Sequence, residues 1–353
     1  MAISTDEVRA WCEQLLAPAP SFPPLESCLA EIPTLDDLAD VGPGSRVLVR
    51  CDGNVTFSSN GVENSARLDS LLETLRFGKE RGWVQIIHSH IGNDGWASLR
   101  LVADHLSGAL GCRVHFLEDW MDDGSGEIKE QAEQEIARLA AGDVIMLENA
   151  RCYSLETSLW RPRPADLMPL VGRLTRYAQT ARERLARIHV NEAFAASNCD
   201  CSSALVPLAM DRVALGRHSA RELSGPVLAA REAEVVVFSG AKFNKLDDLE
   251  EIVARGKVRL LVAGGLLALP LLWADARLAG RTFELGKADE VPASRYGQAC
   301  RLLTTMRQRH MEVLLPVDFV LEDGSIAEQI PAGIAQRDAG PKTLERFASR
   351  LRA

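Results

Sequence analysis

The sequence predicts an α/β fold made of two Rossmann-like parallel-sheet domains joined by a hinge helix. Apolar strand-like runs alternate with amphipathic helix-like stretches from Arg46 onward, and a second such series begins at Glu234. This alternation is typical of βαβ units in parallel sheets. A chain of 353 residues with 46% hydrophobic content is long enough for two cores. We therefore expect a helical extension and linker over 1–32, an acid-substrate-binding domain over 33–215, a hinge helix over 216–232 and a nucleotide-type domain over 233–353.

The N-terminal extension carries a clear helix signal. Ser4 and Glu7 form a capping-box pattern, which predicts a helix over residues 5–17. Four prolines between residues 18 and 25 then predict a linker.

Composition and charge narrow the function. The formal net charge of −9 argues against a nucleic-acid partner and against an anionic membrane surface. Apolar runs stay shorter than a membrane span, and the acidic, amphipathic N-terminus is unlike a signal peptide. We therefore expect a cytoplasmic protein whose eight cysteines are reduced thiols. The cysteines lack the paired spacing of a zinc site, so no metal site is predicted.

The stretch RVLVRCDGNV, residues 46–55, delivers Asp52 and Asn54 just after an apolar run. Residues two positions apart on a strand point the same way. A carboxylate beside an amide can hold the hydroxyl and carboxyl groups of a small substrate. An aspartate and an asparagine in a turn after a buried strand explain the pattern more simply, so the pattern taken alone favours the turn, and the substrate-binding interpretation stays open.

Other predicted strands end in polar side chains in the same manner. Because the carboxyl ends of parallel strands meet at one edge of a sheet, a shared pocket is expected there. The residues concerned are His88, His90, Glu148, Asn149, Arg151, Asn191 and Glu192.

Together these segments resemble phosphoglycerate kinases. The matching stretches are RVLVRCDGNV, SHIG, GDVIMLENAR, HVNEAF, VVFSGAK, RLLVAGG, FELGKADE, EVLLPVDFVLED and DAGPKTLERFA, in the family's order. The resemblance runs from about residue 33 to residue 353. It implies an enzyme that phosphorylates a carboxylate with Mg-ATP, or uses an acyl phosphate with Mg-ADP, by closing two domains around its substrates.

The resemblance also assigns roles to residues. Arg67 matches the arginine that stabilises the transferring group, although a solvated arginine at a helix start is the alternative, and Lys242 matches the catalytic lysine. The implied acid-binding residues are Asp52, Asn54, His90 and Arg151. The implied nucleotide-binding residues are Gly240, Ala241, Lys245, Gly264 and Gly265, with Lys245 standing in for a family lysine that aligns with Leu246.

Departures from the family pattern change the expected substrate. Asn93 and Cys199 stand where the family has arginines, and Asp200 adds a negative charge. Each charge-assisted bond to phosphate contributes about 1.5–3 kcal/mol, so losing two should weaken 3-phosphoglycerate binding severely. We therefore expect a different small acid, such as a hydroxy or amino acid, with Cys199 at its site.

A further departure concerns the second domain. The family adds further strands after the segment GPKTLERFASRLRA, so we expect this domain to lack its last strands, which argues against ordinary use of Mg-ATP. In a sheet of order 3-2-1-4-5 that leaves the strand in Glu234–Gly240 on the edge. Such an apolar edge invites pairing. We expect a second copy of the chain, a partner protein or the N-terminal extension to cover it, unless neighbouring helices repack over it.

Three functions follow from these observations. The first is a divergent enzyme that phosphorylates a small carboxylic acid or uses its acyl phosphate. The second is a noncatalytic binding or regulatory protein of the same fold. The third is an acyltransferase that loads an acyl group onto Cys199. Retention of Arg67 and Lys242 favours the first.

Overall fold

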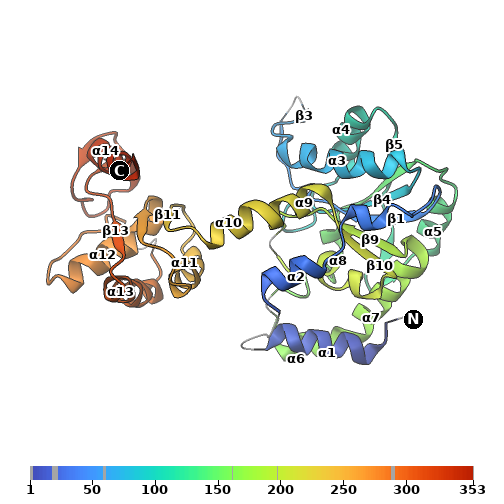
Figure 1. Ribbon diagram of the computed structural model, residues 1–353, viewed down its shortest axis with the longest axis horizontal. Helices are drawn as coiled ribbons and strands as arrows, with labels where there is room; N and C mark the ends of the chain where they lie inside the picture. Colours follow the sequence, from blue (N-terminus) through green and yellow to red (C-terminus); the bar gives the residue numbers. More distant parts are fainter. Residues whose placement is uncertain are drawn as a thin grey trace. The chain divides into compact units, whose positions relative to one another are not determined.

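The computed structural model describes residues 3–17, 23–58, 61–160, 162–196, 198–287 and 291–352. Its chain divides into two compact units, Met1–Pro226 and Val227–Ala353, whose elements Figure 1 labels. Most of the predicted linker over 18–25 lies outside the described residues.

The first unit is built on a six-stranded sheet with the order β10-β9-β1-β4-β8-β5. All of its neighbouring strands pair in parallel, as the alternating pattern predicts. The strands are β1 (Arg46–Arg50), β4 (Val84–His88), β5 (Val114–Leu117), β8 (Val144–Leu147), β9 (Ile188–Asn191) and β10 (Arg212–Leu215). Because β1 lies inside the sheet, the loop that follows it opens at the middle of the carboxyl edge.

Strand alternation sends side chains of this sheet into two separate cores. Leu48 of β1 belongs to one buried cluster, and Val47 and Val49 belong to the other. Figure 1 shows α3 and α4 on one side of the sheet and α1 and α7 on the other. The main helices are α1 (Thr5–Leu16), α2 (Leu25–Glu31), α3 (Ala66–Glu80), α4 (Arg100–Leu110), α5 (Glu130–Ala137), α6 (Pro164–Leu167), α7 (Val171–Thr180) and α8 (Cys201–Ala204).

The predicted N-terminal helix is confirmed as α1. The Ser4 side chain accepts a hydrogen bond from the Glu7 backbone N–H, and the Glu7 carboxylate accepts from the Ser4 N–H in return. Val8 and Cys12 of this helix are buried in the core beneath the sheet. The extension is therefore part of the folded first unit.

The segment predicted as a hinge helix is helical but irregular. It consists of α9 (Arg217–Glu222), a π-helical stretch (Leu223–Val227) and α10 (Leu228–Arg231). Pro226 lies inside the π-helical stretch. Proline lacks the N–H that a regular helix needs and clashes with the preceding turn, which accounts for the irregularity. The division between the two units falls at Pro226.

The second unit contains a parallel three-stranded sheet with the order β11-β12-β13 among the described residues. The expected edge position of the strand after Glu234 is thus confirmed. The strands are β11 (Val235–Phe238), β12 (Leu260–Ala263) and β13 (Glu312–Leu314). The helices are α11 (Lys245–Ala254), α12 (Ala268–Leu278), α13 (Ala293–Gln308) and α14 (Pro341–Arg352).

One expected strand of this unit is wrong. The run VLLPVDFVLE reads as a single strand, but β13 ends at Leu314 and β14 (Phe319–Leu321) joins a different, antiparallel sheet with β15 (Ile326–Ala327) and β16 (Gln336–Ala339). Pro316 lies between the two strands. A proline cannot donate to the hydrogen-bond ladder, so the run breaks there.

Among the described residues, no helix has both the length and the apolar character needed to cross a membrane.

Candidate functional site

The loop after β1 carries Asp52 and Asn54 at the carboxyl edge of the first sheet. Asp52 Oδ1 accepts a hydrogen bond from the Asn54 N–H at 3.0 Å, which is the turn predicted as the simpler alternative. Asp52 Oδ2 accepts from Arg67 Nη1 at 2.9 Å. Asn54 Oδ1 accepts from the Gly92 N–H at 3.1 Å. The turn therefore also positions a carboxylate against a guanidinium.

Asp52 and Arg67 face a small cavity of about 190 Å³. Asp52 is buried, whereas the Arg67 side chain is 47% exposed and can reach a ligand. The cavity is lined by Asp52, Ala66, Arg67, Ser70, Glu192, Phe194, Ala195 and His218. Its volume lies below the 300–1,000 Å³ usual for pockets that hold drug-sized ligands, so it suits a molecule of a few carbon atoms.

Glu192, at the end of β9, is a structural anchor of this cavity. Its carboxylate accepts hydrogen bonds from the backbone N–H groups of His218 and Ser219 at 2.8 and 3.0 Å, and from Thr74 Oγ1 at 2.9 Å. A side chain at Gly216 would collide with this carboxylate. Glu192 thus fixes the first turn of α9 to α3.

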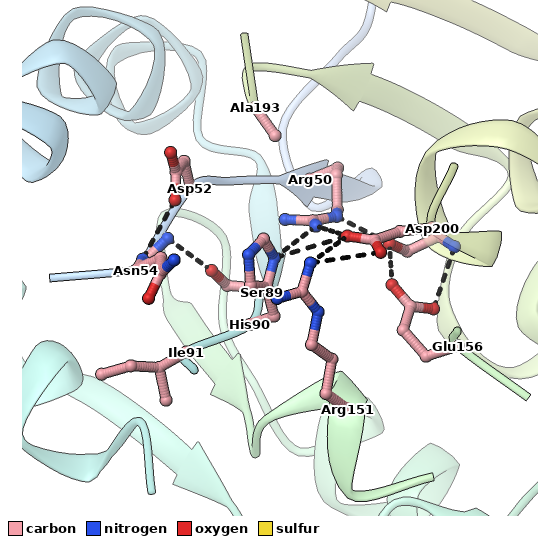
Figure 2. A network of polar contacts seen from close by, with 12 residues as sticks. Arg50, Asp52, Asn54, Ser89, His90, Ile91, Arg151, Glu156, Ala193 and Asp200 are labelled. Carbon is pink, nitrogen blue, oxygen red and sulfur yellow. Dashed lines mark hydrogen bonds and ion pairs between the residues drawn. The ribbon is translucent and has the colours of Figure 1, made fainter. Parts of the chain in front are cut away.

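Elsewhere in the first unit, Asp200 is the centre of a buried charge network, shown in Figure 2. It is fully buried and accepts from Arg50 Nη2 at 2.8 Å and from Arg151 Nη2 at 3.2 Å. Trp160 Nε1 donates to its other oxygen at 2.9 Å. Two guanidinium groups therefore share one internal carboxylate.

His90 belongs to the same network in its neutral form. Its Nδ1 accepts from Arg50 Nη2 at 2.7 Å. Burial, together with the charges of Arg50 and Arg151, lowers the pKa of His90 to about 2. His90 therefore adds no positive charge at neutral pH.

Glu156 and Ser202 complete the network on the far side of Arg50. Ser202 Oγ accepts from Arg50 Nε at 2.6 Å and donates to Glu156, which also accepts from the Ser202 N–H at 3.0 Å. Burial is the main cause that raises the pKa of Glu156 to about 7. This carboxyl group is therefore partly protonated at neutral pH.

The structure separates the predicted acid-binding residues into two groups. Asp52 and Arg67 line the cavity, and Asn54 lies in the Asp52 turn. His90 and Arg151 do not line this cavity and are buried against Asp200. Arg151 also donates to the Gly92 carbonyl at 2.6 Å and stacks over Trp160. Their contact with an acid stays a prediction.

Cys199 is half-buried beside Asp200 in the chain. Burial raises the pKa of its thiol, and the negative charge of Asp200 raises it further. A raised pKa keeps the thiol protonated and a poor nucleophile. Among the described residues, no group of three or more His, Cys, Asp or Glu side chains is placed to hold a metal ion.

The predicted nucleotide-binding residues gather in the second unit, at the carboxyl ends of β11 and β12. Gly240 follows β11, and Gly264 and Gly265 follow β12. Gly265 has a φ of 59°, and a Cβ there would lie 2.7 Å from the Gly240 carbonyl oxygen, so the two loops touch. The turn between β11 and α11 contains Ala241 and Lys242.

The two lysines of this region are exposed. Lys242 precedes α11, and Lys245 begins it and pairs with Asp248 at 2.9 Å. Lys242 and Arg67 belong to different units.

Sequence reasoning did not single out Arg50, Glu156, Trp160 or Ser202. The available signal was Arg50 itself, a charged residue inside the apolar run of β1. A buried arginine requires an internal acceptor. The partner, Asp200, lies 150 residues away in the sequence.

Comparisons with known proteins place this two-unit α/β chain in the kinase class. The family model described as phosphoglycerate kinase matches residues 35–353. The chain is 32% identical over 339 residues to the phosphoglycerate kinase of Rhodospirillum centenum and 29% identical over 322 residues to that of Clostridium beijerinckii. Each match covers 88% of this chain and 75% of the relative. The chain belongs to the phosphoglycerate kinase family.

Solved structures show the same fold. The phosphoglycerate kinase of Pyrococcus horikoshii aligns with a TM-score of 0.72 at 20% identity, over 91% of this chain and 78% of its own. The enzyme of Coxiella burnetii aligns with a TM-score of 0.60 at 23% identity, over 87% of this chain and 74% of its own.

Proposed function

We propose that the protein is a divergent phosphotransferase of this family that acts on a small hydroxy or amino acid and not on 3-phosphoglycerate. It transfers a phosphoryl group to the carboxyl group of this acid, or from the corresponding acyl phosphate. The observation that carries the proposal is the buried pairing of Asp200 with both Arg50 and Arg151.

The pairing removes the electrostatic reason for a phosphorylated substrate. A phosphate group brings up to two negative charges and needs cations without competing anions. Here the Asp200 carboxylate already accepts from both guanidinium groups, and His90 is neutral. An incoming phosphate would have to displace Asp200 or lie beside it, and both are unfavourable in a buried site.

The remaining polar groups suit a small acid. Arg67 offers a fork of N–H donors that matches a carboxylate. Asp52 accepts a hydrogen bond from a hydroxyl or ammonium group, and the cavity of about 190 Å³ leaves little room beyond a short carbon chain. Glycerate, lactate and serine have these features.

In the proposed transfer, a carboxylate oxygen of the acid attacks the γ-phosphorus of Mg-ATP. The new bond joins that oxygen to phosphorus, and the bond to the ADP oxygen breaks, which gives an acyl phosphate and ADP. Arg67 and Lys242 supply positive charge to the phosphoryl oxygens. The glycines at 240, 264 and 265, with Ala241, allow close approach of the backbone to the nucleotide phosphates, and Lys245 adds a cation.

The two other functions have less support. Acyl transfer through Cys199 needs a thiolate, and burial raises the pKa of this thiol. A noncatalytic binding protein remains the alternative if the second unit binds no nucleotide. All eight cysteines are free thiols, which supports our proposal of a cytoplasmic protein.

Calorimetric titration with glycerate and with 3-phosphoglycerate tests the substrate, because the two acids differ only by the phosphate. We expect glycerate to bind at least about 100-fold more tightly than 3-phosphoglycerate, because Asp200 already occupies the cations that a phosphate group would need. Equal or tighter binding of 3-phosphoglycerate, with phosphoryl transfer to it, would overturn the proposal. Titration with Mg-ADP and Mg-ATP tests the chemistry, since absence of binding to the folded protein would leave the noncatalytic alternative.

A further inference from the structure

The cavity that contains Asp52 and Arg67 has more negative than positive charge in its lining. The carboxylates of Asp52 and Glu192 line it together with one guanidinium group, that of Arg67. His218 also lines it. A protonated His218 would only balance the second carboxylate, and with a neutral His218 the lining has an excess of negative charge. A ligand that brings a negative charge and no positive charge therefore meets electrostatic repulsion.

The arginines of α9 near this cavity are paired with other acidic residues. Arg217 precedes His218, and its guanidinium donates to both carboxylate oxygens of Asp36 at 2.6 and 2.9 Å. Arg221, about one turn further along the helix, pairs with Glu73. Neither arginine lines the cavity. A cationic group on the ligand would therefore be the favourable counter-ion for the excess carboxylate.

The polar atoms of the lining are mainly hydrogen-bond acceptors. An ionised carboxylate has about four acceptor positions, and Asp52 uses two of them for the Asn54 N–H and for Arg67. The Ser70 hydroxyl donates to the Arg67 carbonyl at 2.7 Å, so towards a ligand it can only accept. An ammonium group has three donors and no acceptor, whereas a hydroxyl has one donor. An ammonium group therefore suits this lining better.

The ion pair between Asp52 and Arg67 gives a second reason. Asp52 is buried, and its Oδ2 accepts from Arg67 Nη1 at 2.9 Å. A ligand carboxylate that binds the same guanidinium competes with Asp52 for this cation, and a buried carboxylate without its counter-ion is unfavourable. An ammonium group on the ligand gives Asp52 a replacement cation. A hydroxy acid offers no such replacement.

We propose that the acid bound in this cavity is an α-amino acid with a small side chain. It binds as the zwitterion, with its carboxylate at Arg67 and its ammonium group at Asp52. The inference rests on the proposed function and selects one of the two classes of acid that the proposed function allows.

The apolar part of the lining restricts the side chain of the amino acid. It consists of Ala66, Phe194 and Ala195. The Phe194 ring lies edge-on to the His218 ring, with 6.0 Å between the ring centroids. The cavity of about 190 Å³ also has to hold the ammonium and carboxylate groups. Glycine, alanine and serine meet these conditions, and a long or aromatic side chain does not.

Calorimetric titration of the full chain with matched pairs of acids tests the inference. Glycine and glycolate, alanine and lactate, and serine and glycerate differ only in an ammonium group in place of a hydroxyl. Each chiral acid is titrated as both enantiomers. We expect at least one amino acid to bind at least about tenfold more tightly than its hydroxy partner, because the bond to Asp52 is then charge-assisted on both sides. The titrations need no nucleotide, so their result does not depend on phosphoryl transfer.

Asp52→Asn removes the charge and keeps the shape of the side chain. It should reduce the preference for the amino acid over its hydroxy partner to less than about threefold, because the ammonium group loses its counter-ion. Asp69→Asn is the matched control, because Asp69 is an exposed residue of α3 that does not line the cavity. It should keep the wild-type preference. Circular dichroism verifies that each variant is folded.

The outcomes separate this inference from the proposed function. If no amino acid binds more tightly than its hydroxy partner, the inference is wrong and the proposed function still stands. If the folded protein binds none of the six acids, both are wrong. A folded Asp52→Asn variant that keeps the wild-type preference would show that the ammonium group does not bind at Asp52, and would overturn the inference as well.

Discussion

Asp200 accepts a hydrogen bond from Arg50 at 2.8 Å between Oδ2 and Nη2, and neither side chain is exposed. Because Arg151 binds the same carboxylate, Asp200 acts as an internal counter-ion for two buried cations. The charge of this region is thereby balanced within the protein. Removal of Asp200 should make the region dependent on an anion from solution.

Asp200→Ala should lower the free energy of unfolding by about 3–5 kcal/mol, because it leaves Arg50 and Arg151 buried without their carboxylate. Added inorganic phosphate or 3-phosphoglycerate should restore part of the lost stability, since the anion binds the vacated cations. Thermal unfolding with and without the anion measures both effects.

The matched control for Asp200→Ala is Asp104→Ala, at an exposed position of α4. It should change stability by less than about 0.5 kcal/mol and show no specific response to phosphate. Asp200→Asn, which retains the shape, replaces the alanine variant if that variant does not fold. An Asp200 variant that gains no more from phosphate than wild type does would contradict the role of Asp200 as a counter-ion.

Arg67→Ala should separate binding from stability. Its ion pair with Asp52 is half exposed on the arginine side, so its loss should change the free energy of unfolding by no more than about 1 kcal/mol. Binding of the small acid should weaken about 10- to 100-fold, because the charge-assisted bonds are lost. Arg67→Lys keeps the positive charge but loses the forked guanidinium. Its affinity for the acid in calorimetric titration should therefore lie between those of the wild type and Arg67→Ala. Wild-type affinity in Arg67→Ala would exclude Arg67 from the acid site.

Lys242→Ala should reduce phosphoryl transfer without weakening the binding of the acid. Lys242 belongs to the second unit, whereas the acid cavity belongs to the first, so acid affinity should remain unchanged. Phosphoryl transfer in a coupled ADP-release assay should fall by at least about 100-fold, because a cation at the transferring group is lost. A variant with normal turnover would remove Lys242 from the proposed chemistry.

The sequence predicts the parallel sheet of the first unit well, because periodicity and capping are local signals. The Ser4 and Glu7 capping box forms as expected, and Asp52 does follow the buried strand β1. Local patterns carry no information about pairing across long stretches of chain. The partner of Arg50 is therefore not evident from the sequence. A charged residue inside an apolar strand indicates only that it has some buried partner.

The same limit explains the error in the second unit. The apolar run around Pro316 has the composition of a single strand. In the structure it forms two strands, β13 and β14, which pair with different neighbours and so belong to different sheets. The resemblance placed His90 and Arg151 in a substrate pocket. In the structure Arg151 donates to Asp200, and His90 accepts from Arg50, which itself donates to Asp200, so these local partners are not evident from the resemblance, and contact of His90 and Arg151 with an acid stays a prediction.

Glu192→Gln should destabilise the first unit. The Glu192 carboxylate accepts from two backbone N–H groups at the start of α9 and from Thr74, and a neutral amide accepts these bonds less strongly. The free energy of unfolding should fall by about 1–3 kcal/mol in urea titrations. Glu183→Gln, at an exposed position of the same unit, is the control and should be close to neutral. Equal stability of the two variants would show that Glu192 does not anchor α9.

The stability of the first unit should decrease as the pH falls below about 6.5. Burial lowers the pKa of His88 well below its usual value, that of His90 to about 2 and that of His189 to about 4. These histidines take up protons in the unfolded chain near pH 6.5 but stay neutral in the native state, so acid favours unfolding by about 1.4 kcal/mol per pH unit for each proton.

Glu156 acts in the opposite direction. Its native pKa of about 7 exceeds the ordinary 4.5, so its contribution to stability is complete below about pH 4.5 and is lost as the pH rises through 7. Because three histidines oppose this one carboxyl group, the free energy of unfolding should still decrease as the pH falls below about 6.5. Glu156→Gln removes this opposing proton and should therefore steepen the loss of stability between about pH 7 and pH 5 by one proton. Urea titrations of both proteins across this range measure the slopes, and parallel slopes would mean that Glu156 does not titrate there.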